Sequence, residues 1–155
     1  MAGTIGSNCF AQVGMIVKDI EETKRRWAAF LGTEVPETQP AGDYAVTQTT
    51  YQGKPAPKAS CLMAFFDVGP GLQLELIQPN EEPSTWRDFL NEHGEGMHHI
   101  AFQVKDSAKQ VANAEAAGLK LVQRGVYGDG GGEYNYLDAP DLKCIVELLE
   151  SYPKP

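Results

Sequence analysis

The sequence predicts an α+β domain made of two βαβββ repeats, which form a half-open mixed β-sheet cleft with the helices outside. Three observations indicate this. A strand-like stretch ends in Val-Lys-Asp at 17–19 and again at 104–106, an offset of 87 residues. A helix-like stretch follows each copy. Strand-like stretches with one central glutamate, 72–78 and 144–150, then close each half, so a duplicated unit is the simplest explanation.

The first half follows the order strand, helix and three strands. Asp19, with Glu22 three residues later, has the spacing of a capping box, and Gly32 ends the helix that it begins. Thr and Val alternate with other residues before the closing hairpin, so an exposed strand is expected there, followed by a Pro- and Gly-rich loop. The expected ranges are strand 8–18, helix to about 31, strand 43–51, loop 53–58 and hairpin strands 59–68 and 72–78.

A short helix with Trp86, Phe89 and Leu90 on its apolar face joins the halves, because Pro83 and Ser84 are typical of a helix start. The Asp129–Gly132 segment has no lysine and opens no helix, so we expect a flexible hairpin connection there and no phosphate-binding loop. The remaining ranges are linking helix 84–93, strand 97–104, helix 107–117 and strands 119–126, 133–138 and 141–149. One domain covering 1–155 is expected, with halves at about 8–80 and 96–150, since either half alone would bury a marginal core.

Composition excludes several classes of function. The formal net charge is −8 and no basic patch occurs, so we expect no nucleic-acid partner. No apolar run approaches 18 residues and no secretory signal is present, which predicts no membrane span and a cytoplasmic location. The three cysteines are widely spaced within strand-like sequence, which indicates small buried residues in a reducing compartment and excludes a zinc ribbon.

Four residues of the duplicated strands are candidate metal ligands. The glutamates at 75 and 147 share a strand face with large apolar residues, and no Lys or Arg lies in either strand to compensate a buried carboxylate. The repeat offset also aligns the glutamine at 12 with the histidine at 99. One nitrogen and three oxygens without thiolate suit an octahedral site for Zn²⁺, Ni²⁺, Co²⁺, Mn²⁺ or Mg²⁺. The candidate ligands are Gln12, Glu75, His99 and Glu147.

Read one at a time, these residues would be unremarkable. A single glutamate would be an edge-strand residue facing water, and a single histidine a hydrogen-bonded core residue. His98, the neighbour of His99, is expected to point to the opposite face and to pack under a helix. The metal hypothesis therefore rests on the two halves placing equivalent residues together.

The repeat order with ligands on the first and last strands of each half resembles the vicinal oxygen chelate superfamily, also called the glyoxalase/bleomycin-resistance/dioxygenase family. Segments 83–86, 95–101 and 147–154 look most like methylmalonyl-CoA epimerases. That likeness implies that His99 and Glu147 are ligands and that Glu75 occupies a ligand position. Gln12 departs from it, because the epimerases usually have histidine there, and the whole set is similar to zinc-type glyoxalase I. Met63 stands where one epimerase type has an additional catalytic glutamate.

The resemblance implies a metal-dependent epimerase, isomerase or lyase, with Glu75 or Glu147 as the base that abstracts a proton next to a carbonyl through a metal-stabilised enediolate. The alternatives are a glyoxalase I-like lactoylglutathione lyase and a non-catalytic small-molecule binding or resistance protein. Dioxygenases and fosfomycin-type enzymes of the superfamily are similar to one another in using two histidines and one glutamate as metal ligands. This chain lacks the second histidine of such a set.

The expected partners are a small carbonyl or thioester substrate and a second copy of the chain in a homodimer. The sequence does not decide whether the four ligands meet within one chain or across that dimer, nor which metal they bind. It does not identify the substrate either. Only scattered cations, among them Lys54, Lys58, Arg87 and Arg124, could meet an anionic CoA or glutathione conjugate, and they match no motif.

Overall fold

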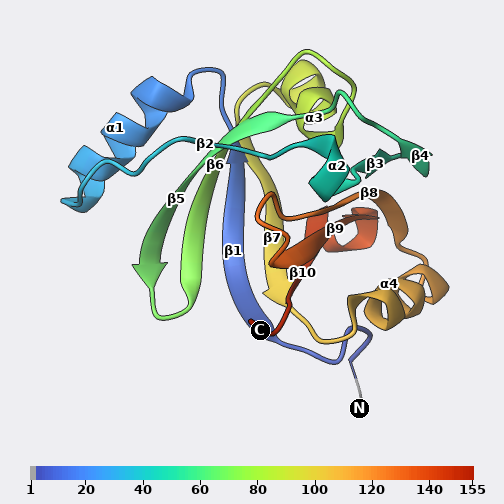
Figure 1. Ribbon diagram of the computed structural model, residues 1–155. Helices are drawn as coiled ribbons and strands as arrows, with labels where there is room; N and C mark the ends of the chain where they lie inside the picture. Colours follow the sequence, from blue (N-terminus) through green and yellow to red (C-terminus); the bar gives the residue numbers. More distant parts are fainter. Residues whose placement is uncertain (1–2) are drawn as a thin grey trace.

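A computed structural model describes residues 3–155, which form one mixed ten-stranded sheet and four α-helices (Figure 1). The strand order is β2-β5-β6-β1-β7-β10-β9-β8-β3-β4, so the sheet has two free ends and does not close. The strands are β1 (Cys9–Ile16), β2 (Gln39–Pro40), β3 (Thr50–Tyr51), β4 (Lys54–Pro55), β5 (Cys61–Gly69), β6 (Leu72–Pro79), β7 (Gly96–Gln103), β8 (Lys120–Val126), β9 (Gly132–Ala139) and β10 (Cys144–Ser151). The helices are α1 (Ile20–Leu31), α2 (Tyr44–Thr47), α3 (Thr85–His93) and α4 (Ser107–Ala116), with a 3₁₀ turn at Pro140–Leu142.

The two halves of the chain join edge to edge through β1 and β7, which pair antiparallel. Each of these strands pairs on its other side, in parallel, with the last strand of its own half: β1 with β6 and β7 with β10. The four central strands are therefore the first and last strands of the two repeats. This arrangement confirms the predicted α+β fold of two βαβββ units around an open cleft.

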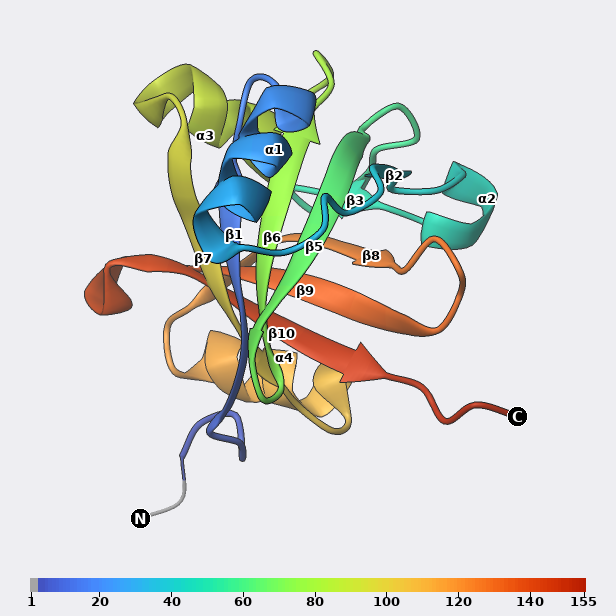
Figure 2. The ribbon, with the colours of Figure 1, turned by 90° about the vertical axis from the view of Figure 1, so that its left-hand side faces the viewer.

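The helices α1 and α4 lie on the outside of the sheet, one against each half (Figures 1 and 2). The Asp19 side chain accepts a hydrogen bond from the Glu22 backbone nitrogen at 2.9 Å, which is the expected cap of α1. Under α1 the sheet contributes Leu74 and Leu76 to the core. The alternate residues of the same strand, including Glu75, therefore point to the opposite face.

The expected exposed strand at 43–51 is wrong. Residues 44–47 form the short helix α2, and only Thr50–Tyr51 are extended, in a strand that pairs with β8 of the other half. The alternation of threonine with other residues, which predicted the strand, has another explanation. Thr47 and Thr49 are both buried, and a hydrogen bond of 3.1 Å joins their hydroxyls. The second strand of the first repeat is instead the two-residue β2, which pairs with β5.

The structure also bears on the predictions about the cysteines and about membrane spans. Cys61 is buried as predicted, but Cys9 is exposed and Cys144 is half-buried, so burial does not explain all three cysteines. None of the helices within residues 3–155 combines the length and the apolar character that a membrane crossing needs.

Candidate active site

The four predicted ligands converge within one chain. One comes from each central strand, in the order β6, β1, β7 and β10, and all four side chains are buried. The His99 Nε2 atom lies 3.0 Å from Glu147 Oε2, 3.5 Å from Glu75 Oε2 and 3.1 Å from the side-chain oxygen of Gln12. We call these residues the four-residue cluster: Gln12, Glu75, His99 and Glu147. Its members do not need a second copy of the chain to meet.

The amide of Gln12 provides a test of whether the cluster fits a cation. Its oxygen faces only hydrogen-bond acceptors. If the amide were turned over, its nitrogen would donate to Glu75 Oε2 at 3.0 Å and to His99 Nε2 and Glu147 Oε2, both at 3.1 Å. Four acceptor atoms that face one another repel unless a proton or another positive charge lies between them, and the set of one imidazole and three oxygens suits a divalent metal ion. The residues present therefore fit such an ion.

Burial and mutual charge perturb the titration of this cluster. Burial raises the pKa of Glu75 to about 8, and the charge of Glu147 adds to the rise against the opposing charge of His99. Burial alone would lower the pKa of His99, but the charge and hydrogen bond of Glu147 and the charge of Glu75 outweigh it and raise that pKa. Without a metal, the cluster thus holds protons at neutral pH where a cation would sit.

We expect the metal-free protein to lose stability as the pH rises from about 6.5 to about 8. The folded state binds the Glu75 proton more tightly than the unfolded chain, whose carboxyl has its ordinary value of 4.5, so this stabilisation is full below 4.5 and lost by about 8. The raised pKa of His99 acts in the same direction above its ordinary 6.5. Urea unfolding at several pH values measures how steeply the free energy of unfolding falls as the pH rises.

The Glu75→Gln variant is the control for this slope, because a neutral amide has no proton to lose. It should flatten the decline in the free energy of unfolding. His98, whose pKa is lowered by burial and by the charge of His99, destabilises the fold only below 6.5, outside the chosen window. A wild-type stability that rises between pH 6.5 and 8 would contradict the expectation.

A β-bulge brings His98 next to His99. Gly14 pairs with His99 and Met15 pairs with Met97, so His98 is the extra residue of β7. Its ring packs against Phe89 of α3, as the sequence predicted. The prediction that it points to the face opposite His99 is wrong, because its Nδ1 lies 2.9 Å from Nδ1 of His99. One of these two nitrogens must carry a proton. If His99 donates to His98, Nε2 of His99 keeps its lone pair toward the cluster, which is the tautomer that a metal ligand needs.

Replacing His98 by phenylalanine is expected to weaken metal binding by about 10- to 100-fold, the usual loss when a hydrogen-bond partner of a metal-ligating histidine is removed. The ring volume is retained and Nε2 of His98 has no hydrogen-bond partner to lose, so the fold should persist. Calorimetric titration with Zn²⁺ or Co²⁺ measures the change. The matched control is His93→Phe on the exposed face of α3, and equal affinities for the two variants would exclude the tautomer role.

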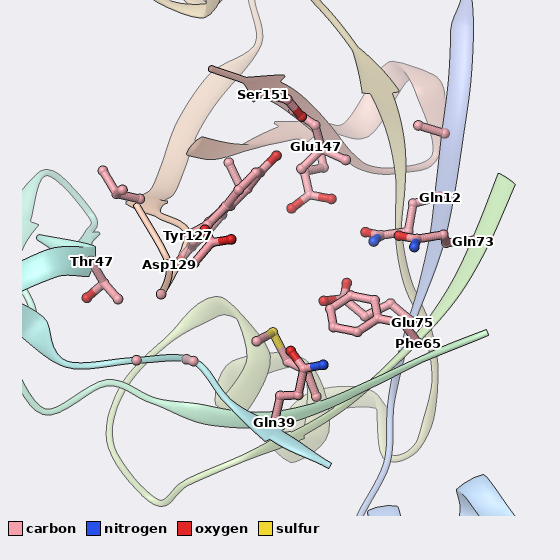
Figure 3. Close-up of a pocket in the computed structure, with 18 of the residues that line it drawn as sticks. Gln12, Gln39, Thr47, Phe65, Gln73, Glu75, Tyr127, Asp129, Glu147 and Ser151 are labelled. Atoms are coloured by element: carbon pink, nitrogen blue, oxygen red, sulfur yellow. The ribbon is translucent and has the colours of Figure 1, made fainter. Parts of the chain in front are cut away.

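The cluster opens into a cavity of about 770 Å³ between the two halves (Figure 3). Met63, Phe65 and Leu149 supply the apolar part of its wall. Burial raises the pKa of the lining tyrosines above the ordinary 10.0, so their phenols stay protonated and can donate hydrogen bonds. These tyrosines are Tyr127, Tyr134 and Tyr136.

Most of the residues that line this cavity were not predicted from the sequence. Asp67, Tyr127 and Asp129 line it from the ends of strands and from a connection between them, and no motif surrounds any of the three. In Figure 3 the Asp129 side chain points toward the space that Glu147 and Glu75 border, and the Tyr127 hydroxyl points toward Ser151. The glycine-rich connection that follows β8 is thus part of the cavity wall.

Comparisons with known proteins agree with this fold. The sequence model of the glyoxalase/bleomycin resistance protein/dioxygenase superfamily matches residues 11–136. An ethylmalonyl-CoA/methylmalonyl-CoA epimerase of Cereibacter sphaeroides is 27% identical over 140 residues, which are 88% of this chain and 92% of the relative.

Two solved structures share the fold. Methylmalonyl-CoA epimerase from Mycobacterium tuberculosis superposes with a TM-score of 0.66 at 21% identity, covering 99% of this chain and 94% of that one. A variant of the Streptomyces coelicolor methylmalonyl-CoA epimerase, in complex with 2-nitronate-propionyl-CoA, has a TM-score of 0.66 at 24% identity and covers 95% and 99%.

Proposed function

Because the chain belongs to the glyoxalase/bleomycin resistance protein/dioxygenase superfamily, we propose that it is a divalent-metal-dependent enzyme that transfers a proton at a carbon next to a carbonyl, as an epimerase or isomerase does. One observation carries the proposal: two buried glutamates, one from each half, meet a histidine and an amide at the base of a large cavity. The similarity to epimerases over most of the chain supports the same reaction class.

The cluster supplies both parts of such chemistry. A divalent metal held by Gln12, Glu75, His99 and Glu147 would act as a Lewis acid on the carbonyl oxygen of the substrate. A carboxylate oxygen of Glu75 or Glu147 accepts the proton from the adjacent carbon. Because these two carboxylates come from opposite halves of the chain and both line the cavity, one can remove a proton from one face of the carbon while the other returns it to the opposite face.

A glyoxalase I-like lactoylglutathione lyase is the second candidate. Gln12 occupies its place in the cluster and Met63 lines the cavity, and these are the two positions where the sequence departs from the epimerases it resembles. The lyase and the epimerase share the proton transfer and differ in substrate, so product analysis separates them. A homodimer, a cytoplasmic location and a single domain over 1–155 stay predictions from the sequence.

The test combines metal content with proton exchange. After incubation with Mn²⁺, Co²⁺, Ni²⁺ or Zn²⁺ and removal of excess ion, we expect about one ion per chain by elemental analysis. In D₂O, the loaded protein should incorporate deuterium next to the carbonyl of a substrate, and removing the metal with a chelator should abolish this. A chain that retains only a small fraction of an ion with every metal would instead be a non-catalytic binding protein.

A further inference from the structure

Tyr136 lies beside the four-residue cluster on the cavity wall. It stands directly opposite Glu147 in the pairing of β9 with β10, so the two side chains are neighbours on the same face of the sheet. Its ring centre lies 5.0 Å from that of His99. Tyr136 is only 2% exposed, yet it lines the cavity. An atom bound at the cluster would therefore lie close to this phenol.

The hydroxyl of Tyr136 accepts one hydrogen bond and donates none. Its oxygen accepts from Nε1 of Trp86 at 2.9 Å, and both of these side chains line the cavity. No acceptor within residues 3–155 makes a hydrogen bond with its proton. A phenol has one proton to donate, and a buried donor without a partner costs stability that a bound oxygen would restore. The hydroxyl is thus ready to receive an oxygen atom of a ligand.

Trp86 holds this hydroxyl in one orientation. The indole follows the first residue of α3, Thr85, whose backbone nitrogen and hydroxyl donate to Oε1 of Gln123 in β8 at 2.9 and 3.2 Å. Trp86 is buried there, and its N–H can only donate. It occupies a lone pair of the phenol oxygen, so the O–H bond has to point away from the indole.

The two other tyrosines of the lining are placed differently. The hydroxyl of Tyr127 points toward Ser151 (Figure 3). The ring of Tyr134 packs against that of Tyr136, with ring centres 5.1 Å apart. Among the aromatic contacts of residues 3–155, the tyrosine ring that touches His99 is that of Tyr136. Of the three phenols, Tyr136 is therefore the one beside the cluster.

We propose that the Tyr136 hydroxyl is a further catalytic group, which donates a hydrogen bond to the carbonyl oxygen of the substrate while the base removes the neighbouring proton. This rests on the proton-transfer function proposed above. When Glu75 or Glu147 takes the proton, the electrons of the C–H bond form a C=C bond and the π electrons of the carbonyl move onto its oxygen. A fixed donor in a buried site stabilises that charged oxygen more than the neutral carbonyl. Tyr136 keeps its own proton, and the electrons shift back when the carbon is protonated again.

The first measurement needs no substrate. Acetohydroxamate is a small anion with two neighbouring oxygens, similar in shape and charge to an enediolate, and calorimetric titration measures its binding to Zn²⁺-loaded protein. We expect Tyr136→Phe to weaken this binding about tenfold or more, the loss of one hydrogen bond to a charged oxygen, with the metal content still at about one ion per chain. The control is Tyr152→Phe, which removes an exposed hydroxyl outside the lining and should leave the affinity unchanged.

A double-variant cycle separates this role from a structural one. Tyr136→Phe also leaves the N–H of Trp86 without its acceptor, whereas Trp86→Phe removes that N–H. If the hydroxyl acts on the ligand, Tyr136→Phe should still weaken acetohydroxamate binding several-fold in the Trp86→Phe background. Circular dichroism and urea unfolding check that each variant folds. No loss of affinity in that background would mean that the hydroxyl serves only Trp86, and the proposal would be wrong.

Turnover distinguishes this proposal from the proposed function. The probes are methylmalonyl-CoA and the hemithioacetal of methylglyoxal with glutathione, one for each candidate reaction, in D₂O. We expect Tyr136→Phe to lower kcat for deuterium exchange about 100-fold and to change KM much less. Equal kcat values for wild type and variant would overturn the catalytic role and leave the proposed function intact. If wild-type protein with about one ion per chain exchanges neither probe, both candidate reactions are refuted and the catalytic role falls with them.

Discussion

Replacing Glu147 by glutamine is expected to lower metal-dependent proton exchange by about 100-fold or more while the chain stays folded. The glutamine side chain has the same shape, and its amide can still hydrogen-bond His99, whose Nε2 lies 3.0 Å from the present carboxylate. It cannot accept a proton from carbon at neutral pH. Glu75→Gln should cause a comparable loss. Deuterium incorporation measures turnover, and circular dichroism with urea unfolding measures the fold.

Metal content separates the two roles that each glutamate could have. A variant that retains about one ion per chain and loses turnover identifies a base. A variant that loses the ion as well identifies a ligand whose removal stops the reaction indirectly. The control is Glu92→Gln on the exposed surface of α3, which should change neither quantity. Near-normal turnover by both single variants would refute the assignment of the cluster as the active site.

The cluster could be predicted because its information is local and repeated. Strand alternation places Glu75 and Glu147 on the faces opposite their leucine neighbours, and the duplication places Gln12 on a strand equivalent to that of His99. Once the two repeats pair through their first strands, the symmetry brings these positions together. The equivalence of the two halves therefore predicted that the four side chains converge, which none of these residues would have indicated alone.

Features that depend on long-range contacts could not be predicted in this way. The contact between His98 and His99 arises from a bulge, which interrupts the alternation that the prediction assumed. Residues 43–51 look extended because their threonines are buried by the second half, and only the folded chain supplies that burial. The lining of the cavity likewise brings together residues such as Asp67 and Asp129, which lie far apart in the sequence.

Gly14 is a further position that nothing in the sequence marks, and Gly14→Ala is expected to disable the site. A Cβ atom there would lie 2.0 Å from Cε1 of His99 and 2.5 Å from its Nε2. The imidazole cannot move aside easily, because it is buried and held between His98 and Glu147. We expect the free energy of unfolding to fall by about 1 to 3 kcal/mol, the usual cost of overpacking a core, and metal affinity to fall at least tenfold.

Combining Gly14→Ala with His99→Ala tests whether the lost stability comes from this contact. If the added methyl group acts by colliding with the imidazole, removing the ring makes room for it, and Gly14→Ala should cost far less stability in the His99→Ala background than in the wild type. Gly3→Ala, where no atom lies within 4 Å of the new methyl group, controls for the general effect of replacing glycine. Equal costs in both backgrounds would mean that Gly14 is needed for a reason other than the space that His99 occupies in the cluster.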